Sequence, residues 1–302
     1  MFSLIDPTVA LAGLFVGFVV GLTGMGGGAL MTPILVLLFK VQPLAAVSSD
    51  IVASMIMKPV GGGVHWRRGT VNIGLVKWLV LGSVPSAFLG VLLLKSSGQG
   101  EALQHHVKLA LGIALLVVAL GLIIRPLLAR GRQAGDSVAP LAVKPLATVL
   151  VGIVGGLVVG LTSVGSGSLM IILLLMLYPK LQLKELVGTD LVQAIPLVAS
   201  AALGHALFGD FRLALTASIL IGSVPGVFIG AQLSSRAPDS LIRPALILVL
   251  LGSSLKLLGT STLILAVVVA AFGVAYWLVR VGEQRSARAS LHASSKSSPA
   301  KG

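Results

Sequence analysis

The sequence contains no cysteine and few charged residues. Because none of its 302 residues is Cys, disulfide bonds, thiol catalysis and Cys-ligated metal sites are excluded. Only 10% of the residues are Asp, Glu, Lys or Arg, whereas 56% are hydrophobic. Soluble globular domains carry about 25% charged residues. The composition therefore indicates an integral membrane protein.

The residue patterns of common enzyme sites are also missing. The sequence contains no HExxH, no nucleotide-binding loop, no Ser-His-Asp order and no His/Asp/Glu cluster with metal-ligand spacing. We therefore expect no catalytic residue, no cofactor and no metal ligand. Without an ATP-binding motif, ATP-driven transport would need another subunit.

Apolar stretches of membrane-spanning length recur along the chain. A helix needs about 20 residues to cross the hydrocarbon core, and no long alternating pattern predicts a barrel. We expect an all-α integral membrane protein with about 8–9 transmembrane segments. The expected segments are 7–23, 29–40, 46–66, 73–95, 106–125, 146–162, 168–178, 186–207, 213–233, 240–259 and 260–280.

The second half of the chain repeats the first. Gly17–Met31 and Gly156–Met170 are identical at ten of fifteen positions, 139 residues apart. Matched residues 140 apart include Asp50 with Asp190, His65 with His205, and Gly82–Pro85 with Gly222–Pro225. This indicates an internal duplication. The expected regions are a first transmembrane repeat (1–125), a basic cytoplasmic linker (126–144), a second repeat (145–259), an extra helix (260–280) and a basic disordered tail (281–302).

The net charge of +13 is explained better by membrane orientation than by nucleic-acid binding, because the basic residues gather in connections and in the tail. If each glycine-rich break is the tip of a helical hairpin, most cations fall on the side of the linker and tail, which is then the cytoplasm. If each break is only a kink, the tail lies outside. The charge bias favours hairpins and two inverted repeats. We expect a lipid bilayer as partner and no nucleic acid; a homo-oligomer is left open.

Two glycine-rich breaks interrupt apolar segments and form the expected binding site. Broken helices in a bilayer leave backbone N–H groups that need a partner, and a helix start presents free N–H groups to an anion. The alternative is that the glycines only let helices pack closely. The expected substrate-binding residues are Thr23, Gly24, Gly26, Gly27, Gly28, Thr162, Ser163, Gly165, Ser166, Gly167 and Ser168.

Asp50 and Asp190 are the paired acids of the membrane segments. Each could serve ion or proton coupling, or could be an interfacial acid stabilised by a helix start. His65 and His205 are further candidates for coupling, with an interfacial or N–H-bonding role as the alternative. Lys58 and Lys77 lie within spans, where snorkelling to the interface is the default interpretation.

The chain resembles the TauE/SafE sulfite exporter family, also called the toluene sulfonate uptake permease family. Gly21–Gly28 followed by Leu30 and Pro33, its second copy Gly160–Leu169, the paired Asp residues and the repeated Gly-Ser-Val-Pro carry the resemblance, which covers about residues 9–259. It implies a multi-pass permease of the bacterial inner (plasma) membrane for sulfite, organosulfonates or related anions. The second break departs from the pattern, because serines replace two glycines and Ile171-Ile172 replaces Thr32-Pro33.

The sequence thus favours a secondary transporter of small anions with its site at the two breaks, possible proton coupling, and a cytoplasmic C-terminal tail. Three alternatives remain open: a cation-coupled carboxylate transporter that uses Asp50 and Asp190, an anion channel of the same architecture, and a membrane scaffold that binds no anion.

Overall fold

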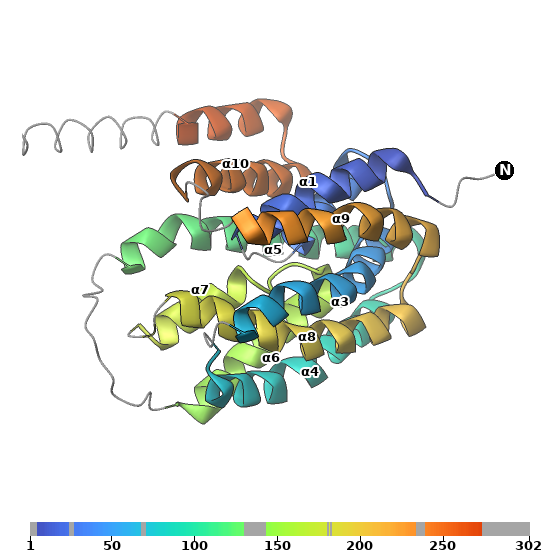
Figure 1. The fold of residues 1–302 in the computed structure, drawn as a ribbon. Helices are drawn as coiled ribbons and strands as arrows, with labels where there is room; N and C mark the ends of the chain where they lie inside the picture. Colours follow the sequence, from blue (N-terminus) through green and yellow to red (C-terminus); the bar gives the residue numbers. More distant parts are fainter. Residues whose placement is uncertain are drawn as a thin grey trace, which may run out of the picture. The chain divides into compact units, whose positions relative to one another are not determined.

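The computed structural model describes residues 5–23, 27–67, 71–129, 143–179, 181, 183–233 and 239–273 (Figure 1). Within these residues every regular element is a helix. The helices are α1 (Pro7–Thr23), α2 (Gly28–Leu37), α3 (Pro43–Arg67), α4 (Ile73–Ser96), α5 (Gly100–Ala129), α6 (Pro145–Thr162), α7 (Leu169–Leu177), α8 (Leu183–Phe208), α9 (Leu213–Leu233), α10 (Asp239–Leu257) and Thr262–Gly273.

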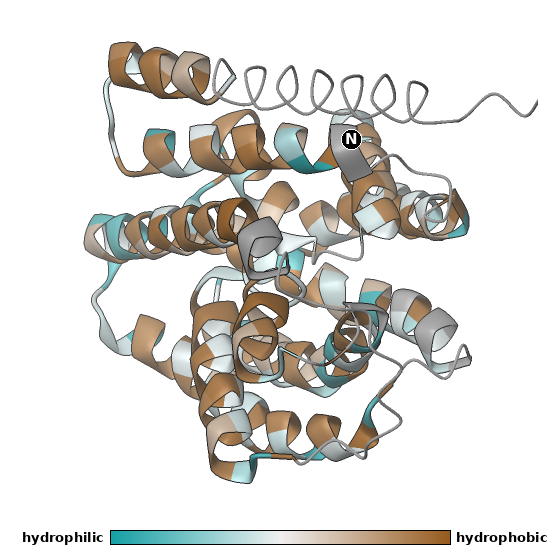
Figure 2. Cartoon of the chain, turned by 90° about the vertical axis from the view of Figure 1, so that its left-hand side faces the viewer, coloured by the Kyte–Doolittle hydropathy of each residue, from teal (hydrophilic) through white to brown (hydrophobic). Residues whose placement is uncertain are grey.

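The helices follow the apolar segments closely, and the all-α membrane class is confirmed. Within the described residues, six stretches are long and apolar enough to cross a membrane: Pro43–Val60, Ile73–Ser96, Gly100–Ile124, Pro145–Thr162, Glu185–Phe208 and Leu213–Leu233. Helices α1, α2 and Thr262–Gly273 are shorter. Hydrophobic residues run along these helices in Figure 2. The expected number of 8–9 spans stays a prediction.

The chain separates into two compact units, Met1–Leu258 with α1 to α10, and Gly259–Gly302. Residues 126–129 of the expected linker belong to α5, whereas 130–142 lie outside the described residues. The tail 281–302, expected to be disordered and cytoplasmic, also lies outside them, as does 274–280.

The first long helix of each half packs on a helix of the other half. Helix α1 packs along α9, and α6 packs along α4. Small residues bring the backbones together, because a Cβ at Gly17 would meet the backbone of Ser223 and one at Gly156 would meet that of Ser83. These glycines therefore let the helices pack closely. This is the role that was considered as the alternative for the glycines of the breaks. The repeated Gly-Ser-Val-Pro supplies the facing surfaces.

Helices α3 and α8 lie side by side in opposite directions. Ser48, near the start of α3, bonds through its Oγ to Nδ1 of His205 near the end of α8, at 2.9 Å. Each helix start also holds the connection that follows the other helix: the amide N of Arg212 donates to Ser49 Oγ at 3.3 Å, and that of Asn72 donates to Thr189 Oγ1 at 3.0 Å. The beginning of each helix is thus fastened at the end of its neighbour.

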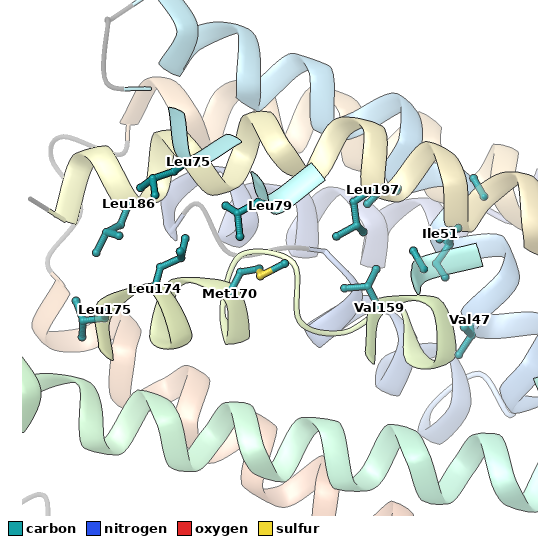
Figure 3. Close-up of a cluster of buried hydrophobic side chains, with 14 of the residues drawn as sticks. Val47, Ile51, Leu75, Leu79, Val159, Met170, Leu174, Leu175, Leu186 and Leu197 are labelled. Atoms are coloured by element: carbon teal, nitrogen blue, oxygen red, sulfur yellow. The ribbon is translucent and has the colours of Figure 1, made fainter. Parts of the chain in front are cut away.

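A hydrophobic cluster lies between α3, α4, α6, α7 and α8 (Figure 3). Its buried members include Ile51, Leu79, Val159, Met170 and Leu197. Because each comes from a different helix, the cluster joins the second break to both α3 and α8. The polar groups of the second break are therefore held in place by closely packed hydrophobic side chains.

Candidate functional site

The second break leaves helical geometry over six residues. Helix α6 ends at Thr162, and Ser163 takes a left-handed φ of 62°. Gly165 and Gly167 have φ of 122° and 105°, values that side chains with a Cβ rarely adopt. Helix α7 begins at Leu169. The glycines are therefore required by the backbone path of the break.

The second break is the tip of a helical hairpin. Met170, just after the break, packs against Gly155 before it. At the far end, Tyr178 Oη accepts the amide hydrogen of Lys144 at 2.9 Å and lies 2.5 Å from Thr148 Oγ1. Helix α7 therefore returns along α6 to the place where α6 began. This is the hairpin that the charge distribution favoured for this break.

The first break meets the second inside the protein. Gly24 and Gly26 lie outside the described residues, but Gly27 and Gly28 are buried at the start of α2. A Cβ on Gly28 would collide with the backbone carbonyl of Ser163. The two expected half-sites thus touch each other and form one region.

Asp50 joins the two breaks through hydrogen bonds. Its Oδ2 accepts from Ser163 Oγ at 2.6 Å and from Thr32 Oγ1 of α2 at 2.9 Å. Asp50 is 1% exposed and lies two turns into α3. The alternative of an interfacial acid at a helix start does not fit this position, because the dipole effect is confined to the first turn.

Asp190 occupies the corresponding place in α8 with different partners. Its Oδ1 accepts from Gln193 Nε2 at 2.9 Å, and the carboxylate also accepts the backbone N–H of Gly167 in the second break. Gln193 Oε1 in turn accepts from Ser83 Oγ at 3.2 Å. Asp190 is fully buried, but its Oδ2 has no hydrogen-bond partner among the described residues.

Lys58 is buried between the two acids, so snorkelling is the wrong interpretation for this lysine. Its side chain is 6% exposed and interacts electrostatically with Asp50 and Asp190. Within the described part of the chain, its Nζ has no hydrogen-bond partner. Asp50 and Lys58 are eight residues apart, about two helical turns, which places them on one face of α3. Lys77, in contrast, is exposed on α4.

The hydroxyl groups of the breaks differ in their hydrogen bonds. Thr23 Oγ1 donates to Val19 O at 2.8 Å, and Thr162 Oγ1 donates to Val158 O at 2.6 Å. Ser166 and Ser168 are both buried, and Ser168 Oγ lacks a partner among the residues that the structure describes. We call Lys58 Nζ, Ser168 Oγ and Asp190 Oδ2 the three unsatisfied atoms of the site; a fourth buried atom without a partner in the described residues, Ser223 Oγ, lies on α9.

His205 is fully engaged by neighbouring groups. The carbonyl of Gly160 can only accept, so His205 Nε2 donates to it at 2.8 Å and Nδ1 accepts from Ser48 Oγ. His205 therefore ties α8 to α6 and α3, in agreement with the N–H-bonding alternative. The side chain of His65 lies outside the described residues.

The site thus contains two carboxylates and one ammonium group, all buried. Buried charges are costly unless they are paired, and at membrane depth they usually mark ion or substrate pathways. Sequence reasoning missed Lys58, Thr32 and Gln193 as members of the site. Spacing along one helix could have found two of them, because Lys58 follows Asp50 by eight residues and Gln193 follows Asp190 by three. In the described ranges no three His, Asp or Glu side chains lie close enough to hold a metal ion.

Comparison with known proteins identifies the family. The model of the family described as Sulfite exporter TauE/SafE matches residues 9–257. The chain is 41% identical over 257 residues to the probable membrane transporter protein YjnA of Bacillus subtilis (strain 168), covering 83% of this chain and 99% of that protein. It is 26% identical over 242 residues to the probable membrane transporter protein YdhB of the same organism, covering 80% of this chain and 95% of YdhB.

No solved structure gives a significant match. The family match covers both breaks, both buried acids and Lys58. The expected resemblance is therefore confirmed. The chain belongs to the TauE/SafE sulfite exporter family, whose members are membrane transporters and not enzymes.

Proposed function

We propose that the protein is a secondary transporter of small anions that binds them where the two breaks meet. The observation that carries this proposal is the contact of Gly28 with Ser163, which brings both breaks together beside the buried ammonium group of Lys58. Sulfite, organosulfonates and related sulfur-containing oxyanions fit best, because their oxygens accept hydrogen bonds and the family description names sulfite.

The donors available to such an anion are fewer than the sequence suggested. Ser163 Oγ donates to Asp50, and the N–H of Gly167 is taken by Asp190. Lys58 Nζ and Ser168 Oγ are buried donors with no partner in the described part of the chain. We therefore assign the first contacts of the anion to these two groups, with Ser166 and the buried glycines of the breaks lining the site.

We further propose that the halves are inverted repeats that rock against each other to alternate access. Three observations support this arrangement: α3 and α8 run in opposite directions, α1 and α6 exchange partners between the halves, and the amide clamps at Ser49 and Thr189 correspond in position. The proposed location is the bacterial inner membrane, with the C-terminal tail in the cytoplasm.

A cation-coupled carboxylate transporter is a second candidate, favoured by one specific observation. The site holds two carboxylates against one ammonium group, and Asp190 Oδ2 is among the three unsatisfied atoms. An excess of buried negative charge would suit a bound cation. This candidate predicts that uptake requires Na⁺ or another metal cation. A proton-coupled transporter would need no metal cation.

Flux measurements on purified protein in liposomes test the proposal. Sulfite, sulfate, an alkylsulfonate and a small carboxylate are supplied with and without a pH gradient, in Na⁺ and in choline buffers. We expect saturable movement of sulfite or the sulfonate above that of protein-free liposomes. Movement of none of the four anions would contradict the proposed function, and Na⁺-dependent movement of the carboxylate alone would favour the second candidate.

A further inference from the structure

Among the lysines and arginines of the described residues, Lys58 alone is buried. It has no basic counterpart in the other half. The corresponding residue 140 positions later is Val198, which is also buried. An ammonium group removed from water without a hydrogen-bond acceptor is unfavourable. Nothing in packing requires it, because a valine fills the matching place. A buried donor without a hydrogen-bond partner, about two turns along α3 from the Asp50 that bonds the second break, is a group that is arranged to receive a ligand.

The two acids that face Lys58 are held to different degrees. Asp50 Oδ2 accepts two hydroxyl hydrogens, from Ser163 and Thr32, and such bonds are stronger when the acceptor is charged. Asp190 is held through Gln193 and the Gly167 amide, while its Oδ2 belongs to the three unsatisfied atoms. Asp190 is therefore the acid that can lose its role as counter-ion with less rearrangement.

The net charge of the site limits how an anion can enter. With both carboxylates ionised and Lys58 protonated the site carries one negative charge, and an added anion would bring a second. Doubling an uncompensated charge in a dry interior is strongly unfavourable. Adding one proton together with the anion leaves the net charge of the site unchanged. For a monovalent anion such as hydrogen sulfite or a sulfonate, charge balance in the site thus links each bound anion to one proton.

We propose that Lys58 is the residue that binds the transported anion, and that the anion replaces Asp190 as the counter-ion of Lys58 while Asp190 takes up one proton. The proposal rests on the proposed function and adds the residue, the charge and the stoichiometry. The anion and the proton enter from the same side. After the halves rock, both leave on the other side, and Asp190 ionises and again balances the charge of Lys58.

Among the titratable acids of the helices that pack against α3, Asp190 is the fully buried one with an oxygen that lacks a partner in the described residues. Helices α2 and α9, which pack against α3, carry no titratable side chain. Helix α8 contributes Asp190, the half-buried Glu185 of its first turn, and His205, whose two ring nitrogens are bonded to Ser48 and Gly160. Tyr178 lies at the far end of the α6–α7 hairpin with Thr148. Helix α5, which also packs on α3, has Glu101, His105 and His106 exposed and Lys108 half-buried.

The first test removes the charges of Lys58 and Asp190 together. The double variant Lys58→Met/Asp190→Asn leaves no new unpaired charge from this pair, so it should fold and melt close to the wild type. Because the anion loses its charged partner, we expect sulfite uptake into liposomes to fall about 30-fold or more. Lys77→Met is the matched control, since Lys77 is an exposed lysine within a span; its uptake should equal that of the wild type.

The second test counts protons through binding. Methanesulfonate carries a fixed charge near neutral pH, so any pH dependence of its binding comes from the protein. One linked proton predicts that wild-type affinity weakens about tenfold for each pH unit from pH 6 to 8. In Asp190→Asn, which keeps Lys58, binding persists and its affinity is independent of pH. Sulfite is measured in parallel, and its own titration cancels in the comparison of the two proteins.

The outcomes separate this proposal from the proposed function. If the wild type moves sulfite and the folded double variant moves it within about threefold of that rate, Lys58 does not bind the anion, although the protein is still an anion transporter. If Asp190→Asn retains the wild-type pH dependence, the exchange of counter-ions is wrong. If the wild type neither binds nor moves any of these anions, both proposals fall together.

Discussion

Asp50 and Asp190 stand at the same position of the two halves but in different surroundings. Asp50 is bonded by the hydroxyls of Ser163 in the second break and of Thr32 in α2, whereas Asp190 is bonded by the amide of Gln193 and the N–H of Gly167. The residues that correspond to Ser163, Thr32 and Gln193 are Gly24, Ile171 and Ala53, which cannot make the same side-chain hydrogen bonds. The halves thus share a backbone arrangement but bond their acids differently: Asp50 is bonded to the second break and to α2, whereas Asp190 keeps one oxygen without a hydrogen-bond partner among the described residues.

The largest expected effect comes from forcing the two breaks apart. Gly28→Ala places a Cβ against the carbonyl of Ser163, so we expect a loss of about 3 kcal/mol in the free energy of unfolding. Thermal unfolding in detergent measures it. Gly252→Ala in α10 is the control, because nothing lies within 4 Å of its Cβ. If the two variants melt alike, the breaks do not touch.

Substitution of the corresponding glycine of the second break, Gly167, should destabilise the protein for another reason. Gly167→Ala meets a φ of 105°, and a left-handed backbone costs about 1–2 kcal/mol for a residue with a Cβ. We expect a smaller loss of stability than for Gly28→Ala, measured in the same way. A loss larger than that of Gly28→Ala would contradict the view that Gly28 is needed for a close contact and Gly167 for its backbone conformation.

The next effect compares the two acids directly. Asp50→Asn weakens two hydrogen bonds to a charged group, each worth about 1.5–3 kcal/mol, so we expect a loss of about 2 kcal/mol. Asp190→Asn retains an amide oxygen for Gln193 and should lose about 1 kcal/mol or less. Chemical unfolding of both variants tests this order. The reverse order would show that Asp190, not Asp50, fixes the breaks.

The smallest effect on stability is expected at Ser168. Ser163→Ala removes the donor to Asp50 and should cost about 1.5–3 kcal/mol, whereas Ser168→Ala removes a hydroxyl with no partner among the described residues and should change stability by about 0.5 kcal/mol or less. Sulfite uptake should nevertheless fall in Ser168→Ala. Unchanged uptake in a stable Ser168→Ala variant would remove this serine from the site.

The fold was largely predictable because helix length and apolar composition decide it in a membrane. The expected segments 7–23 and 213–233 coincide with α1 and α9, and the hairpin at the second break followed from the positions of the cations. The exchange of partners between α1 and α6 was not predictable in the same way. It depends on glycine faces such as Gly17 against Ser223, which are more than 200 residues apart.

The site was predictable in place but not in chemistry. The breaks, Asp50 and Asp190 were expected, and the structure brings them together. Their hydrogen-bond partners come from distant helices, as with Ser163 and Asp50, which are 113 residues apart in sequence. Lys58 was misread because snorkelling is the usual interpretation of a lysine within a span, and the sequence alone does not show that tertiary packing buries it.

The central claim is that the two breaks form one shared anion site and not two equivalent ones. Isothermal titration of the purified protein with sulfite, or with methanesulfonate, tests it most directly by counting bound anions. We predict one anion per chain for the wild type and loss of that binding in Lys58→Met/Asp190→Asn. Two equivalent anions per chain, or binding that survives in the folded double variant, would contradict the account.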